Sequence, residues 1–263
     1  MSLTGKSPSE TYKDLTYVDN NNIGVDSTTR SVKTGNGSST AISVSDRALK
    51  VKSATDNTTA LDVQNSSGTS KLSVDTTNNQ VKALGHHVNT QYAYFGIGAT
   101  EASSFATNTH QPVPFVTNAI GASVLQDDIA FGTSTDPATT FTTADGTNTD
   151  ASLLVPLMWY VPDAISIDGI TSLEGATAAT GDTTRMHLYS YTFTSGSTSA
   201  LTSGTLLAHN SDVTNAGSEQ AYKSTWTIDS ASVSAGKVIL VFFRCDSTKS
   251  DYSLNITVKY HLT

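Results

Sequence analysis

Three short apolar triplets constrain the first third of this 263-residue chain more than any other feature. They pair Leu49 with Val51, Leu61 with Val63, and Leu72 with Val74, at spacings of 12 and 11 residues. In a strand, an apolar–polar–apolar triplet places both apolar side chains on one face. Turn-forming residues follow each triplet. The pattern therefore predicts short strands, each with one narrow apolar face.

Two apolar side chains per strand are too few to build a core within one chain, so such strands need neighbours. Between Ser53 and Gln80, 11 of 28 residues are Ser or Thr and none is aromatic. A flexible linker is the alternative, but a linker has no reason to keep a regular spacing. We therefore predict an intertwined homotrimeric stalk, with a core formed by Leu49, Val51, Leu61, Val63, Leu72, Val74 and Val81.

The composition favours an ordered all-β protein. Only 14% of residues are charged and the net charge is −8, while residues suited to pleated surfaces are plentiful. The 15 basic residues are scattered, which argues against nucleic acid as a partner. No apolar run approaches the roughly 18–20 residues of a membrane span. The start also lacks a signal-peptide core, so we expect synthesis in the cytoplasm and no membrane insertion.

The C-terminal part has stronger strand patterns, and its aromatic residues begin at Tyr92. Residues 237–244 are apolar on both faces and predict a central buried strand. The other predicted strands are 152–161 (with Pro156 marking an edge or bulge), 164–170, 184–194, 221–228 and 252–262. Many strands at this spacing predict a β-sandwich or jelly roll.

Two of these strands have defined faces. In 184–194, Met186, Leu188 and Ser190 face one way, and Arg185, His187, Tyr189, Tyr191 and Phe193 face the other. In 221–228, one face carries Tyr222, Ser224, Trp226 and Ile228. The predicted organisation is an N-terminal attachment segment (1–45), a repetitive β stalk (46–85) and a β-sandwich or jelly-roll-like head (86–263).

Signatures of catalysis are missing. The chain has no nucleophile elbow, phosphate-binding loop, zinc-binding helix or paired cysteines. Its single cysteine, Cys245, excludes an intrachain disulfide and is expected to be a buried small hydrophobe. Glutamates are few and lie in polar, loop-like contexts, at Glu10, Glu101, Glu174 and Glu219. We therefore expect no enzyme, no catalytic residues and no cofactor.

Three weaker signals each have a plainer alternative. In a trimer, three copies of His86 or of His87 could meet on the axis and hold an ion, but a hinge between stalk and head is favoured. The oxygen-rich segment Asp145–Asp150 and the pair Asp127 and Asp128 suggest calcium, but solvated turns are favoured. Four aromatics suit either a carbohydrate-stacking surface or the core, and the core is favoured: Tyr189, Tyr191, Trp226 and Tyr252.

Several segments resemble phage virion proteins. TALDVQNSSGTSKLSVDTTNNQVKALG (Thr59 to Gly85) is similar to the short-strand repeats of tailed-bacteriophage fibre and appendage proteins. The stretch that begins SPSETYKDLTYVDNNN resembles N-terminal segments of virion proteins from marine phages. SLLVPLMWYVPDAISIDGI and AGKVILVFFRCDSTKSDYSLNITVKYHL resemble the jelly-roll-like tips that follow such stalks.

The resemblance implies a homotrimeric structural protein located in the virion, attached to capsid or tail proteins by its N-terminal segment. The chain is short for a host-reaching fibre, so a head fibre or capsid decoration spike fits its length best. The alternative is a short tail fibre or receptor-binding adhesin that recognises a host surface glycan. A depolymerase is the weakest of the three, since such enzymes need a longer β-helix and clustered acids.

Overall fold

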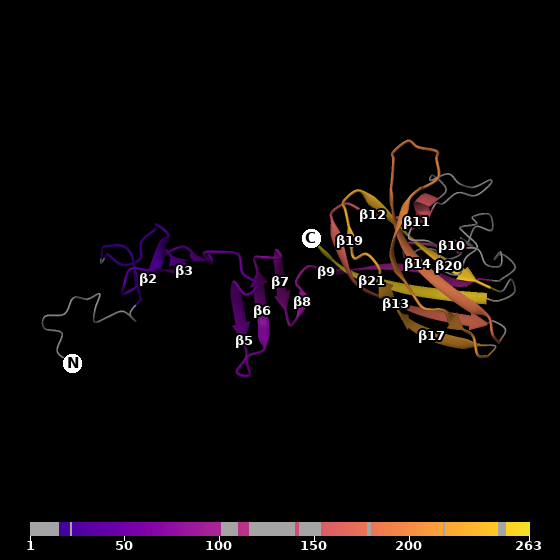
Figure 1. Ribbon diagram of the computed structural model, residues 1–263, viewed down its shortest axis with the longest axis horizontal. Helices are drawn as coiled ribbons and strands as arrows, with labels where there is room; N and C mark the ends of the chain where they lie inside the picture. Colours follow the sequence, from indigo (N-terminus) through magenta and orange to yellow (C-terminus); the bar gives the residue numbers. More distant parts are fainter. Residues whose placement is uncertain are drawn as a thin grey trace. The chain divides into compact units, whose positions relative to one another are not determined.

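The computed structural model describes residues 16–21, 23–100, 110–115, 140–141, 154–177, 180–217, 219–246 and 251–263 (Figure 1). The fold is all-β, as expected, and it divides into two compact units. We call Met1–Val88 the N-terminal unit and Asn89–Thr263 the C-terminal unit. Among the described residues, no helix is both long enough and apolar enough to cross a membrane.

The N-terminal unit contains two four-stranded antiparallel sheets. The first has the order β1 (Thr16–Val18), β2 (Arg30–Thr34), β3 (Ser39–Val44) and β4 (Leu49–Val51). The second has the order β5 (Leu61–Gln64), β6 (Ser70–Asp75), β7 (Gln80–Ala83) and β8 (His86–His87). Each predicted apolar triplet lies in a strand, and each sheet follows the order of the chain.

Side-chain oxygens close the turns of the second sheet. Asn65 Oδ1 accepts from the backbone N–H of Ser67 at 3.2 Å and of Thr69 at 2.8 Å. Asp75 Oδ1 accepts from the backbone N–H of Asn78 at 2.9 Å. These are the local bonds for which Asn and Asp are favoured in turns. Gly68, at φ +79°, takes the left-handed position in the first of them.

Two domain boundaries differ from those expected. The boundary at 45/46 passes between β3 and β4, which pair through Val44 with Leu49 and Ile42 with Val51. The boundary at 85/86 falls just before β8, which pairs with β7 and so belongs to the second N-terminal sheet. Composition shifts mark changes in side chains, whereas strand pairing decides which segments fold together.

The C-terminal unit is a β-sandwich of a five-stranded and an eight-stranded sheet, with antiparallel pairing throughout its described strands. The five-stranded sheet has the order β17 (Gln220–Thr225), β13 (Ile165–Thr177), β21 (Asp251–Leu262) and β9 (Thr90–Thr100), with β19 (Ser232–Val233) beside β13. The eight-stranded sheet has the order β10 (His110–Val113), β20 (Lys237–Cys245), β14 (Thr183–Thr192), β15 (Gly204–His209) and β11 (Thr140–Phe141). Beside these lie β12 (Trp159–Val161), β16 (Val213–Thr214) and β18 (Thr227–Ile228).

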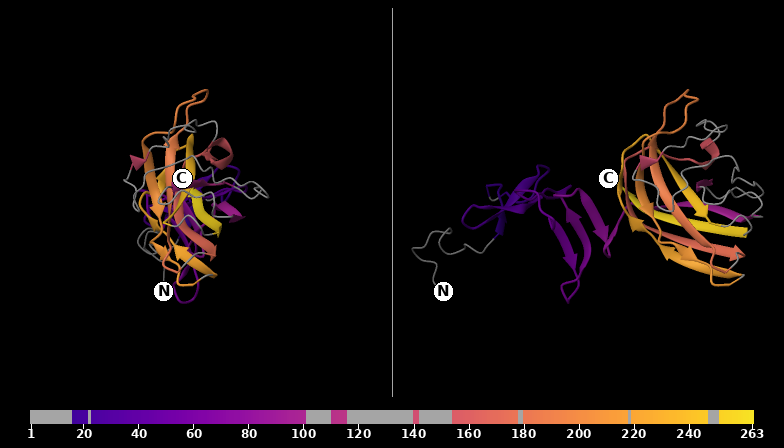
Figure 2. Two further views of the ribbon diagram at one scale, coloured as in Figure 1. Left: turned by 90° about the vertical axis from the view of Figure 1, so that its right-hand side faces the viewer. Right: turned by 45° about the vertical axis from the view of Figure 1, so that its right-hand side comes forward.

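The main core fills the space between the two sheets of the C-terminal unit, which face each other in Figure 2. The five-stranded sheet supplies Ile256 and Val258, and the eight-stranded sheet supplies Val241 and Phe243, all fully buried. Cys245 is buried in the same cluster, as expected. Burial on both faces confirms 237–244 as a central strand, since β20 lies between β10 and β14.

A second apolar cluster covers the other face of the eight-stranded sheet. It contains Tyr189, Tyr191 and Phe242, packed with Leu154 and Leu157. Met186 and Leu188 lie in the main core, so β14 alternates between two apolar layers. The predicted faces of 184–194 are therefore correct, and both are buried through Tyr191.

Three predicted strands are wrong in extent. The strand predicted at 164–170 continues to Thr177 as β13. In 152–161, a 3-10 helix, η2 (Val155–Leu157), occupies the middle, with Pro156 near its start, and the strand begins at Trp159. Proline has no backbone N–H, so it cannot donate to a strand ladder. It suits the first turn of a helix, where that N–H would have no partner within the helix. In 221–228, the chain leaves the five-stranded sheet after Thr225, and β18 pairs with β15 of the other sheet. The alternation of side chains continues through Trp226, so the sequence pattern does not show that the chain passes from one sheet to the other there.

Candidate functional site

The second sheet of the N-terminal unit has one apolar face. In the register of β5, β6 and β7, Leu61 lies opposite Val74, Val63 opposite Leu72, and Val74 opposite Val81. Residues opposite one another in an antiparallel pair point to the same side. These five side chains therefore form one patch, which we call the stalk apolar face.

The stalk apolar face is open in the single chain. Leu61, Leu72 and Val81 are each 38% exposed and Val63 is 48% exposed, while Val74 is half-buried. The opposite side of the same sheet is polar, because Asp62, Ser73 and Lys82 lie side by side in the same register. The sheet is thus amphipathic, and its apolar side is the one that lacks cover from the described chain.

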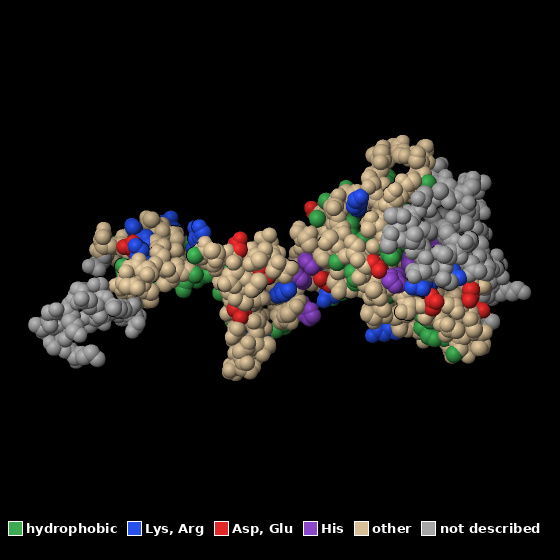
Figure 3. All heavy atoms as spheres, in the orientation of Figure 1, with side chains coloured by type: hydrophobic (Ala, Val, Ile, Leu, Met, Phe, Trp, Pro, Cys, Tyr) green, Lys and Arg blue, Asp and Glu red, His purple; other side chains and the backbone are tan. Residues whose placement is uncertain are grey.

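The first N-terminal sheet repeats this arrangement. Ile42 lies opposite Val51 and Val44 opposite Leu49, so these side chains share one face. Leu49 is 69% exposed and Val51 is 41% exposed. In Figure 3, hydrophobic side chains reach the surface of the N-terminal unit, and charged groups are scattered over the face in view. All seven predicted stalk-core residues therefore lie on strands.

The adjacent histidines lie on the short strand β8. His86 pairs with Ala83 and His87 with Lys82, and successive strand residues point to opposite faces. His86 is exposed and His87 is half-buried. One chain therefore offers one histidine per face, and axial ion binding between copies stays a prediction.

The four aromatics considered for a binding surface are buried. Tyr189 and Tyr191 belong to the second apolar cluster, and Tyr252 contacts Phe243 in the main core, with ring centroids 4.9 Å apart. Trp226 is 5% exposed, and its Nε1–H donates to Ser172 Oγ at 2.9 Å. A stacking surface formed by these residues is wrong, and the favoured core interpretation is confirmed. Exposed aromatics stand elsewhere: Tyr92, Tyr94, Tyr160 and Phe193.

A polar cluster lies at one end of the outer face of the eight-stranded sheet. The His187 ring lies 5.1 Å from the His110 ring and 6.1 Å from the His209 ring. Arg185 and Arg244 occupy directly opposite positions on β14 and β20. Burial, reinforced by His110 and Arg185, lowers the pKa of His187 to about 2. The imidazole is therefore neutral at physiological pH, which suits packing better than proton transfer.

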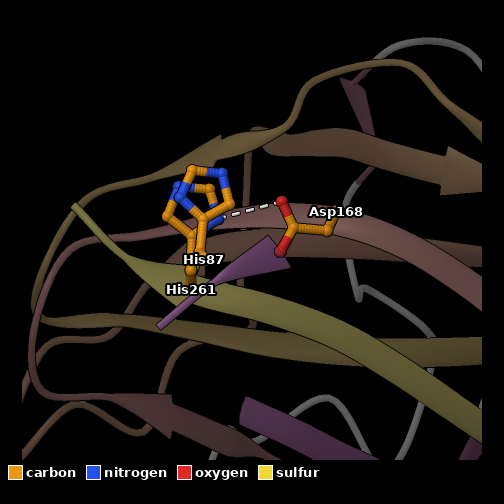
Figure 4. A group of neighbouring side chains, drawn as sticks. All are labelled: His87, Asp168 and His261. Carbon is orange, nitrogen blue, oxygen red and sulfur yellow. Dashed lines mark hydrogen bonds and ion pairs between the residues drawn. The ribbon is translucent and has the colours of Figure 1, made fainter. Parts of the chain in front are cut away.

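Two histidines of the C-terminal unit are oriented by carboxylates. His261 Nδ1 lies 2.9 Å from Asp168 Oδ1, the contact drawn as a dashed line in Figure 4. His209 Nδ1 lies 2.7 Å from Asp229 Oδ2. Such a carboxylate fixes the ring orientation and the tautomer of its histidine. Asp168 and His261 are 93 positions apart in the sequence, so no local pattern signals this pair.

Glu174 is a buried carboxyl group between the two sheets of the sandwich. It is 3% exposed on β13, and its Oε1 accepts from Thr184 Oγ1 of β14 at 2.7 Å. Burial raises its pKa to about 7, although the Thr184 bond opposes the rise. The polar, loop-like context inferred for Glu174 is wrong, because the strand continues to Thr177. Glycines and threonines around it hid the strand.

The remaining acidic residues considered for a site are exposed or lie outside the described residues. Glu219 is exposed beside β17. Four residues and one segment fall outside the described residues, and their roles stay predictions: Glu10, Glu101, Asp127, Asp128 and the segment Asp145–Asp150.

Comparison with known proteins leaves the function open. No protein-family model and no curated protein matches the sequence. Among solved structures, the chain is similar to the crystal structure of an aminopeptidase from the marine sediment archaeon Thaumarchaeota archaeon, at 9% identity and a TM-score of 0.33. The likeness covers 72% of this chain but 40% of that chain. At this TM-score, the likeness carries no argument about activity.

Proposed function

We propose that this chain is a non-enzymatic structural protein of a phage virion, a homotrimeric head fibre or capsid decoration spike. Its N-terminal segment attaches to virion proteins, its N-terminal sheets form the trimer contact, and its C-terminal β-sandwich faces outward. The virion assignment rests on the sequence resemblance. The oligomeric role rests on the stalk apolar face.

The stalk apolar face carries the proposal because five apolar side chains share one side of a three-strand ladder. At about 25 cal/mol per Å² of apolar surface buried, covering such a face stabilises an assembly substantially. The face presents Leu and Val without a charge in its register, so its chemistry matches a like face of another copy. Repetition on the first sheet, at Ile42, Leu49 and Val51, extends the same contact along the chain.

The C-terminal unit needs no partner for its own core, which suits a head carried on an oligomeric stalk. Its interior is filled from both sheets, and a second cluster covers the outer side of β20. Its perturbed groups fit a packing role. His187 is held neutral, and Glu174 bridges the sheets through Thr184.

The mass of the full chain in solution tests the oligomeric part. We expect a monodisperse trimer by light scattering or native mass spectrometry. A monodisperse monomer whose residues 40–85 are protected from hydrogen exchange would overturn the trimer, because an ordered stalk would then exist without partners.

Location on the particle tests the virion part. Gold-labelled antibody against the C-terminal unit should decorate the capsid shell of phage particles. Label at the tail would instead support the alternative, a short tail fibre, and absence of the chain from purified particles would overturn both.

A further inference from the structure

The outer face of the five-stranded sheet of the C-terminal unit is open, and its side chains alternate except at the bulge that holds Asp168 on β13 and at a register shift between β21 and β9. Along β21, Tyr252, Leu254, Ile256 and Val258 are buried, while the intervening residues are half-buried or exposed. Neighbouring strands keep this alternation in register. The outward positions are Tyr92, Tyr94, Gly96 and Gly98 on β9; Ser253, Asn255, Thr257 and Lys259 on β21; Gly169, Thr171, Leu173 and Gly175 on β13; and Ala221, Lys223 and Thr225 on β17. We call these fifteen positions the outer face.

Two tyrosines stand on one edge of the outer face. Tyr92 is 53% exposed and Tyr94 is 46% exposed, and both point outward from β9. Tyr92 lies opposite Lys259 and Tyr94 opposite Thr257 on β21. A pair of tyrosines two residues apart on a strand presents apolar rings and hydroxyls on a single side.

A hollow lies at one end of the five-stranded sheet and extends over its four main strands. It has a volume of about 570 Å³, and its lining includes Ile97 of β9, Glu174 of β13, Lys223 of β17 and Asn255 of β21. A Cβ on Gly175 would lie 2.5 Å from Ser253 Oγ, so the sheet has no room for a larger residue without moving that hydroxyl.

The outer face carries two lysines, with one exposed carboxylate beside them. The fifteen outward positions include Lys223 and Lys259, and Asp168, in the bulge before Gly169, is paired with His261 Nδ1 at 2.9 Å, so Lys223 is the lysine farther from a carboxylate of this face. A local positive potential on an acidic protein attracts anions. Asn255, Ser253 and Thr257 add hydrogen-bonding groups between the lysines and the tyrosines.

We propose that the outer face binds an acidic polysaccharide, with sugar rings against Tyr92 and Tyr94 and its anionic groups near Lys223 and Lys259. The four main strands span about 14 Å from β9 to β17, taking about 4.8 Å between neighbours. An extended sugar chain lying across them reaches from the tyrosines on β9 to Lys223 on β17, which lines the hollow. This inference does not depend on a virion location or on trimer formation.

Titration of the full chain with alginate, dextran sulfate and uncharged dextran tests the proposal. We expect the two anionic polymers to bind, with affinity that falls as salt is raised, and dextran to bind at least about tenfold more weakly. Tyr94→Ala should weaken alginate binding about tenfold, and Lys223→Gln should weaken it and reduce its salt dependence.

Two matched controls lie off the outer face. Tyr160→Ala removes an equally exposed tyrosine (56%) on the eight-stranded sheet, and Lys82→Gln removes a lysine of the N-terminal unit. Both should leave alginate affinity unchanged. Equal losses in the controls, or equal binding of dextran, would overturn the proposal.

A change of assembly mass in Tyr94→Ala, without a change in alginate affinity, would also overturn it, because the outer face would then be a contact between copies. The trimer proposal has a separate readout, since it predicts that Tyr94→Ala keeps the wild-type mass.

Discussion

The two units are built from the same antiparallel strands, but they differ in what covers their apolar faces. In the C-terminal unit, Val241 and Phe243 on one side of β20, and Leu240 and Phe242 on the other, are fully buried. In the N-terminal unit, Leu61 and Leu72 remain 38% exposed. The difference teaches that an apolar strand face can be covered by a second sheet of the same chain, as in the C-terminal unit, or left open by the described chain, as in the N-terminal unit.

The titratable groups of the two units also differ in what shifts their pKa values. In the N-terminal unit, hydrogen bonds from Asn78 hold the pKa of the half-buried Asp75 below its usual value. In the C-terminal unit, burial dominates, and it raises the pKa of Glu174 and lowers that of His187. Turns order the first unit locally, whereas a dry interior orders the second.

The largest expected effect is a loss of stability in the C-terminal unit when a core aromatic is truncated. Phe243→Ala removes a fully buried ring that contacts Tyr252, and we expect a loss of about 3–5 kcal/mol in the free energy of unfolding. Both tryptophans, Trp159 and Trp226, lie in the C-terminal unit, so urea unfolding followed by tryptophan fluorescence reports on it. A loss below about 1 kcal/mol would contradict the core assignment.

A charge on the stalk apolar face should weaken self-association and leave the stability of the C-terminal unit unchanged. We expect Leu72→Asp to weaken self-association by on the order of 3 kcal/mol, about a hundredfold, since an aspartate there would be buried at the contact. The urea midpoint of tryptophan fluorescence should stay unchanged. Sedimentation equilibrium measures the association. Ser73→Asp, on the polar side of the same strand, is the matched control and should keep the wild-type mass.

Alkaline pH should reveal the buried carboxyl group. The folded pKa of Glu174, about 7, exceeds the ordinary value of 4.5. Its contribution is therefore fully present below pH 4.5 and is lost as pH rises to about 7. Glu174→Gln should remove this loss, which is up to about 3 kcal/mol between pH 4.5 and 8. Urea unfolding at both pH values measures it, and exposed Glu219→Gln should behave as wild type.

Acid should reveal the buried imidazole, with the opposite sign. The folded pKa of His187, about 2, lies below the ordinary 6.5, so its contribution is present above pH 6.5 and is lost as pH falls. The slope is about 1.4 kcal/mol per pH unit at most. Between pH 6 and 5, His187→Gln should lose less stability than wild type in urea unfolding. Parallel slopes for the two proteins would show that His187 is protonated in the fold.

Sequence alone determined the strands whose side chains alternate or are wholly apolar. Residues 237–244 and 252–262, and the faces of 184–194, follow from periods that backbone geometry imposes. The three Leu–Val triplets likewise fall on β4, β5 and β6. These features depend on neighbours in the chain, which a sequence displays directly.

Only the tertiary structure decided what lies against those strands. It buried Tyr189, Tyr191 and Glu174, moved the chain between sheets at Trp226, and exposed Tyr92 and Tyr94 instead. Each outcome depends on residues distant in sequence, such as Thr184 for Glu174 and Ser172 for Trp226. Alternation tells that a strand has two faces, but the packing of a second layer decides which of them is dry.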